Sequence, residues 1–176
     1  SIKGFNNTAV DYEEDAKTTW SNVESSYQRR TDLIPNLVAT VKGYAAHESE
    51  TLEAVIKARA AATSTKIDAG NLSPEKMAQF QKAQQGLSGA LGRLMVVAER
   101  YPDLKANTNF LELQSQLEGT ENRINVARNR FNNGVNAYNK HIKIFPNSVF
   151  AGWLGFEEMA RYQAAEGSEK APEVKF

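Results

Sequence analysis

The sequence contains no cysteine and only two histidines among its 176 residues. The absence of cysteine excludes disulfides, thiolate nucleophiles and cysteine-ligated zinc or iron–sulfur sites, although it does not fix the compartment. With His47 and His141 as the only imidazoles, few histidine-based metal or acid–base sites can be built. Lys plus Arg and Asp plus Glu are equal at 21 each, so no net charge favours nucleic acid or an anionic surface.

Proline and glycine are also scarce, with 5 and 11 residues, and no apolar run approaches the roughly 20 residues of a membrane-spanning helix. Ala, Leu, Glu, Lys, Arg and Gln are common instead, which is typical of a helical protein. The length suffices for one domain with a hydrophobic core. The chain begins at Ser1 without methionine, so we expect a processed or truncated form, which leaves room for an anchor or signal upstream.

The stretch of residues 20–48 predicts a long helix, because its apolar residues recur every three or four positions. These residues are Trp20, Val23, Tyr27, Ile34, Leu37, Val41 and Tyr44. Pro35 interrupts a helical backbone, but the pattern stays in phase across it, which favours one helix bent near Thr31–Pro35. We expect Thr8 to cap this helix and residues 1–7 to form a tether.

Further helical segments follow. Residues 49–62 continue a helical face, and Ser73-Pro74-Glu75 begins a helix that extends to Tyr101. Asn107 or Thr108 caps a last long helix that ends before Pro146. The sequence therefore predicts an all-α fold, an antiparallel bundle of three to four long helices over residues 8–156.

The end of the chain differs from the rest. Residues 147–156 form its most apolar window, and we expect Trp153 and Phe156 to pack a short helix or turn against one end of the bundle. Residues 157–176 are expected to form a C-terminal tail, polar from Gly167 onward and lying over the surface or disordered.

No catalytic or metal-binding motif is complete. Residues 47–51 begin like a zinc-protease helix but lack its second histidine. Glu118 and Glu121 have carboxylate spacing, but no histidine follows at the position that di-iron bundles require. Glycine occurs at every third position of 86–92 inside a helical pattern, which predicts close approach of a neighbouring helix rather than phosphate binding. We therefore predict no catalytic residue, metal or cofactor.

Polar residues on or beside the apolar stripes form the one candidate site. They are Arg30, Asn36, Glu99, Glu121 and Arg128. Buried charges are costly unless they are paired, so we predict an inter-helix network in which Arg30 faces a glutamate. Such a network can serve only to fix helix register, or it can bind a ligand.

Four segments resemble the LemA family of bacterial proteins, in order and over nearly the whole chain. They read QRRTDLIPNLVATVKGYAAHE, RLMVVAERYPDLKAN, ENRINVARNRFNNGVNAYN and FPNSVFAGWLGF. The resemblance implies an N-terminal transmembrane anchor before a helical bundle, and hence single-pass attachment to a bacterial cell membrane, on a side left open. It implies no enzymatic activity. Tyr162-Gln163 departs from the aromatic pair common in the family, which leaves the docking of the C-terminal segment open.

Three functions are compatible with these features. The first is a non-catalytic, membrane-anchored interaction or scaffold module of the bacterial envelope, with a protein partner and no nucleic acid. The second is a small-ligand-binding or sensor bundle that uses the polar cluster. The third is membrane remodelling through self-assembly of long helices.

Overall fold

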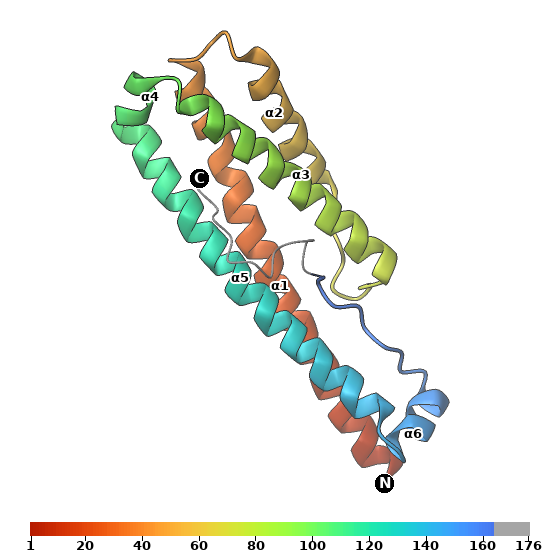
Figure 1. Cartoon of the computed structure of the whole chain (residues 1–176). Helices are drawn as coiled ribbons and strands as arrows, with labels where there is room; N and C mark the ends of the chain where they lie inside the picture. The colour runs from red at the N-terminus through yellow and green to blue at the C-terminus, as the bar shows by residue number, and fades with distance from the viewer. Residues whose placement is uncertain (164–176) are drawn as a thin grey trace.

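The computed structural model describes residues 1–163 and shows six helices there (Figure 1). They are α1 (Ile2–Lys42), α2 (Ser49–Ser64), α3 (Pro74–Ala98), α4 (Pro102–Ala106), α5 (Thr108–Lys143) and α6 (Asn147–Leu154). No strand occurs in this part of the chain. The prediction of an all-α antiparallel bundle is confirmed.

Helices α1 and α5 form an antiparallel pair that runs the length of the molecule (Figure 1). Each carries a buried stripe at helical spacing, so the two stripes close on one another. Trp20 of α1, fully buried, meets Phe131 of α5 with ring centroids 5.1 Å apart. At Gly134 the helices come close, since an added Cβ would lie 3.8 Å from the Cα of Ala16.

The α2–α3 hairpin packs against the half of this pair that lies farthest from the N-terminus (Figure 1). That half has a four-helix core around Leu37, Leu91 and Leu117. In the middle of the pair, Phe80 at the start of α3 packs on Trp20. The other half is covered by α6 and by residues 157–163, which run extended beside α5 and which we call the C-terminal strap. The bundle is therefore thicker at one end than at the other.

The N-terminal residues are helical, in contrast to the tether expected for 1–7. Ser1, not Thr8, caps α1, because its hydroxyl accepts from the Gly4 N–H at 3.2 Å. Phe5 and Ala9 are buried against the end of α5 and α6, so tertiary packing orders this segment. Pro35 lies inside an uninterrupted α1, as the unbroken apolar pattern predicted.

Helix starts encoded locally match the prediction. The Ser73 hydroxyl accepts from the Lys76 N–H at 3.2 Å, and the Asn107 carboxamide oxygen accepts from the Phe110 N–H at 3.0 Å. The interpretation of residues 86–92 was wrong. No heavy atom lies within 4 Å of a Cβ added at Gly86 or Gly92, so these glycines face open space.

The apolar window at 147–156 does form a short helix, α6, at the end of the bundle where α1 begins (Figure 1). Phe156 packs edge-on against Phe5, with centroids 5.7 Å apart. Trp153 does not pack as expected, because 72% of its surface is exposed. The polar tail from Gly167 lies outside the described residues.

Candidate functional site

Arg30 is a buried cation that joins α1 to α3. Its side chain is only 2% exposed. The guanidinium donates to the Ser88 hydroxyl at 2.7 Å, to the Gln84 side-chain oxygen at 2.9 Å and to the Gln84 carbonyl at 3.0 Å. It also lies 5.2 Å from the centre of the Tyr27 ring. Burial lowers the pKa of Arg30, and the nearby Tyr27 and Glu121 partly offset this effect.

The expectation that Arg30 pairs with a glutamate was wrong for residues 1–163, where no carboxylate forms an ion pair with it. Glu121 acts on Arg30 only through longer-range attraction. Neutral groups on α3 accept its hydrogen bonds instead. Gln84 lies among the buried residues of α3, between Phe80 and Leu87. A polar residue at such an apolar position was the feature of the sequence that could have indicated a buried polar partner for Arg30.

A pair of tyrosines extends the polar centre toward α5. The hydroxyls of Tyr27 and Tyr162 are 2.6 Å apart, and the Arg128 guanidinium lies 4.1 Å from the centre of the Tyr162 ring. Burial raises the pKa of both tyrosines, which keeps them neutral. Tyr162, only 4% exposed, thus docks the C-terminal strap in the core.

Two asparagines of α5 hold the strap. Asn132 exchanges two hydrogen bonds with the backbone N–H and C=O of Tyr162, both at 2.8 Å. Asn139 does the same with Met159, at 2.8 and 2.9 Å. Seven helical residues rise about 10.5 Å and three extended residues span about 10 Å, so the two spacings match. The strap is therefore bound much as a strand is bound at a sheet edge.

The five predicted site residues fall into two groups. Arg30, Glu121 and Arg128 surround the Tyr27–Tyr162 pair. Asn36 is exposed on α1, and its carbonyl accepts from Thr40. Glu99 is exposed beyond the end of α3 and pairs with Lys105 at 2.6 Å. The structure brings the first three together and leaves the other two outside the centre.

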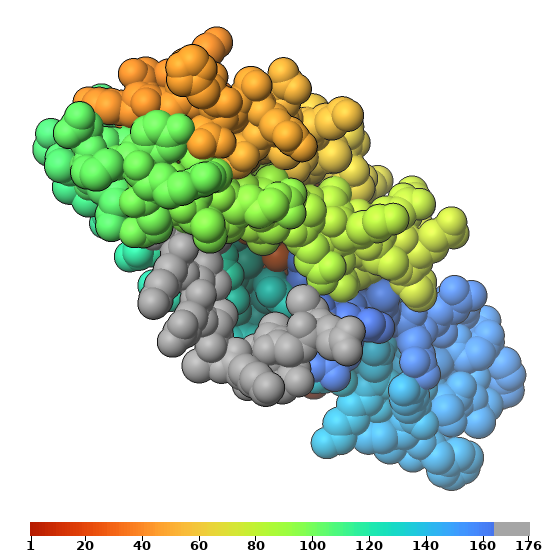
Figure 2. Space-filling model, turned by 45° about the horizontal axis from the view of Figure 1, so that its top comes forward, coloured from red at the N-terminus to blue at the C-terminus, as the bar shows by residue number. Residues whose placement is uncertain are grey.

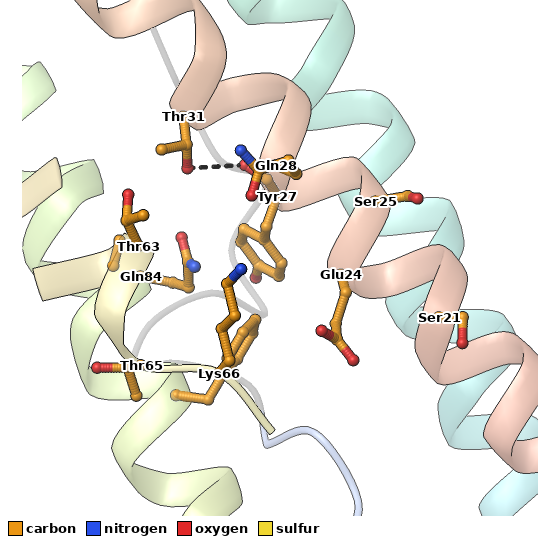
Figure 3. Close-up of a pocket in the computed structure, with 12 residues that line it drawn as sticks. Ser21, Glu24, Ser25, Tyr27, Gln28, Thr31, Thr63, Thr65, Lys66 and Gln84 are labelled. Carbon is orange, nitrogen blue, oxygen red and sulfur yellow. Dashed lines mark hydrogen bonds between the residues drawn. The ribbon is translucent and has the colours of Figure 1, made fainter. Parts of the chain in front are cut away.

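A cavity of about 290 Å³ opens beside this centre, between α1, α3 and the α2–α3 connection (Figure 3). Glu24 and Lys66 reach into it from opposite sides. Burial raises the pKa of Glu24, and contacts with the indole of Trp20 and the charge of Lys66 partly offset the shift. The cavity also has hydroxyl and amide groups, including those of Thr31 and Gln84. These groups could bind a small polar molecule.

A second candidate surface is the groove lined by α1 and α5 alone, which we call the α1–α5 groove. It consists of two adjoining hollows of about 520 and 380 Å³ that share Arg29 and Arg123. Arg130 and the exposed Val126 line the larger of the two hollows. None of the three arginines forms an ion pair within the described residues. Asp32 is the one carboxylate among the lining residues, against three arginines, so the groove is basic and partly apolar. No helix of residues 1–163 other than α1 and α5 lines it.

Residues 1–163 contain neither a group of side chains suited to a metal ion nor a membrane-spanning helix. No group of three or more His, Asp or Glu side chains is placed to hold a metal ion. None of the helices described there is both long enough and apolar enough to cross a membrane.

Comparisons with known proteins agree with the resemblance. Magnetosome protein MamQ 1 of Paramagnetospirillum magneticum is 29% identical over 89% of this chain and 64% of its own length. MamQ of Magnetospirillum gryphiswaldense is 29% identical over 87% and 62%. Protein LemA of Metamycoplasma hominis is 26% identical over 83% and 63%. The chain thus spans less than two thirds of the length of these relatives, and none of their names is that of an enzyme. The sequence profile of the LemA family matches residues 19–176, and the chain belongs to that family.

Proposed function

We propose that this chain is the partner-binding part of a membrane-attached bacterial protein, and that it holds another protein without transforming a substrate. The unpaired arginines of the α1–α5 groove carry the proposal. Three cations without a carboxylate partner create a positive potential that an acidic partner would neutralise. The exposed Val126 and half-buried Leu33 supply apolar contacts in the same groove.

The partner that fits this groove is an amphipathic helix with acidic residues flanking its apolar stripe. The antiparallel helices α1 and α5 lie side by side, and the furrow between them is of the kind into which a third helix packs. The same pair already packs against the α2–α3 hairpin on another part of its surface, which supports helix packing as the mode of binding. The bundle then acts as a scaffold, with one face closed by its own chain and one face open.

The proposed attachment is a single anchor preceding α1, in a bacterial cell membrane. The family resemblance and the greater length of the relatives support it. Protease digestion of intact cells that produce the full-length protein tests the side on which the bundle lies. Protection of the bundle from an external protease places it inside, and cleavage places it outside.

Site-specific photo-crosslinking tests partner binding. A photoreactive residue at Val126 should capture one reproducible protein, whereas one at Ile56, which is equally exposed at 52% on α2, should not. The double variant Arg29→Glu/Arg123→Glu should abolish capture. Lys82→Glu/Arg93→Glu, which reverses two exposed charges of α3, should not. Equal capture at both positions, or capture that survives the groove variant, contradicts the proposal.

The cavity at Glu24 supports a second candidate, a small polar ligand site. A half-buried carboxylate opposite a lysine suits a molecule that carries both an amino and an acidic group. Thermal unfolding with millimolar amino acids tests it, since a bound ligand raises the melting temperature. A ligand that stabilises the wild type but not Glu24→Gln would support the site. No shift with any of them would count against it.

A further inference from the structure

The end of the molecule that contains α6 exposes large apolar side chains. Between Lys143 and Glu157 the chain has no charged residue. Five residues of this segment are strongly exposed: Ile144 at 48%, Phe145 at 78%, Val149 at 40%, Trp153 at 72% and Leu154 at 42%. We call them the α6 patch. Single exposed apolar residues are ordinary, but five within eleven residues of the chain, two of them large aromatics, indicate a binding surface.

The opposite side of α6 already makes the contacts that hold the helix in place. Ala151 is buried with Phe5 and Ala9 of α1, and Phe150 lies 5.8 Å from the Phe5 ring. Val149 and Trp153 are one turn apart, so they share the outer face of α6. The patch residues are thus exposed while the other side of the helix is packed. Helix α6 itself lies at one end of the bundle (Figures 1 and 2).

We propose that the α6 patch inserts into the interfacial region of a phospholipid bilayer. Tryptophan and phenylalanine are suited to that zone, and a short helix with one apolar face lies in its plane. The N-terminal end of α1, with the exposed Ile2, lies at the same end of the molecule (Figure 1). The bundle would then stand with its α6 end on the membrane and its α2–α3 hairpin directed away. This orientation extends the proposed membrane attachment.

Charge around the patch indicates that insertion depends on apolar contact. Lys143 is neutralised by Glu158 at 2.9 Å. Lys3 and Lys140 have no acidic partner within residues 1–163, but Glu157 follows the patch directly. Because the cations and anions nearly balance, binding should occur on neutral lipid and should weaken little with added salt.

Vesicle binding by the purified chain tests the proposal without any anchor. The sequence has two tryptophans, of which Trp20 is fully buried and Trp153 is exposed, so a change in emission reports on the patch. Phosphatidylcholine vesicles should shift the emission to the blue, and brominated lipid should quench it. In co-sedimentation, Phe145→Ser/Trp153→Ser should lower partitioning about tenfold or more. Val96→Ser, at an equally exposed position of α3, should leave it unchanged.

Three outcomes would overturn the proposal. The wild type fails to bind vesicles of phosphatidylcholine, alone or with phosphatidylglycerol. It binds, but the patch variant, with an unchanged circular dichroism spectrum, binds equally well. Or the wild type forms dimers that the patch variant does not, without vesicle binding, which makes the patch an interface between copies. Crosslinking from Val126 is measured separately, in detergent. An absence of vesicle binding would therefore not contradict the partner-binding proposal.

Discussion

Replacing Arg30 by methionine tests whether the buried cation specifies how α1 meets α3. Methionine fills much of the same space without charge or donors. The change leaves three acceptors on α3 without their present donor, namely the Ser88 hydroxyl and the two oxygens of Gln84. Gln84 is only 4% exposed, so water cannot readily replace the guanidinium there. Ser88 is half-buried and can bond to water more easily.

The magnitude follows from two opposing effects. Each hydrogen bond from a charged donor contributes about 1.5–3 kcal/mol, so the three together contribute roughly 5–9 kcal/mol. Removing the cation also abolishes its desolvation penalty, which is several kcal/mol for a buried ion. We expect a net loss of about 2–4 kcal/mol in the free energy of unfolding. For a chain of this length the melting temperature should fall by roughly 5–15 °C.

Urea unfolding followed by far-UV circular dichroism measures the loss. Combining Arg30→Met with Gln84→Met completes a double-mutant cycle, in which we expect a coupling of at least about 1 kcal/mol. Arg29→Met is the matched control, because this neighbouring arginine is exposed, and it should change stability by less than about 0.5 kcal/mol. If Arg30→Met matched the control, or if the two core changes were additive, Arg30 would not specify the pairing of α1 with α3.

Three further predictions concern a charge, a glycine and the strap. Burial raises the pKa of Glu24 above its ordinary 4.5, so the folded state binds this proton more tightly and stability falls as pH rises above that value. Glu24→Gln should abolish this loss of stability with rising pH. At neutral pH the variant should have a higher melting temperature than the wild type. Gly86→Ala should raise the free energy of unfolding by about 0.5–1 kcal/mol in urea, since the site is helical and open. Asn132→Ala/Asn139→Ala should speed tryptic cleavage after Arg161, whereas Asn136→Ala, at an exposed position, should not.

Much of the fold could be predicted because its signals are local. The caps at Ser73 and Asn107 depend on side chains three residues from the N–H groups they accept from. The apolar stripe of α1 depends only on helical spacing, and it outweighed Pro35. The tether prediction for residues 1–7 failed because Phe5 gains its helix-stabilising contacts from residues more than 130 positions away.

The candidate site was predicted less well, because its partners come from distant segments. That Arg30 would be buried could be inferred from its place on the stripe. Its acceptors lie 54 and 58 residues away on α3. Gln84 does occupy an apolar position of α3, but the sequence pattern does not connect that position to Arg30. Tyr162 reaches Tyr27 over 135 residues, through a segment without periodicity.

An all-α bundle of the LemA family can be recognised without coordinates, because helical periodicity, caps and family segments all lie in consecutive residues. Which surfaces remain exposed for binding depends on how distant segments pack. In the described residues, Arg30 is enclosed among neutral acceptors, the strap covers one side of α5, and no third helix covers the α1–α5 groove. Trp153 is exposed, although the apolarity of its segment predicted burial. Periodicity fixes which face of a helix is apolar, but burial depends on whether another element covers that face.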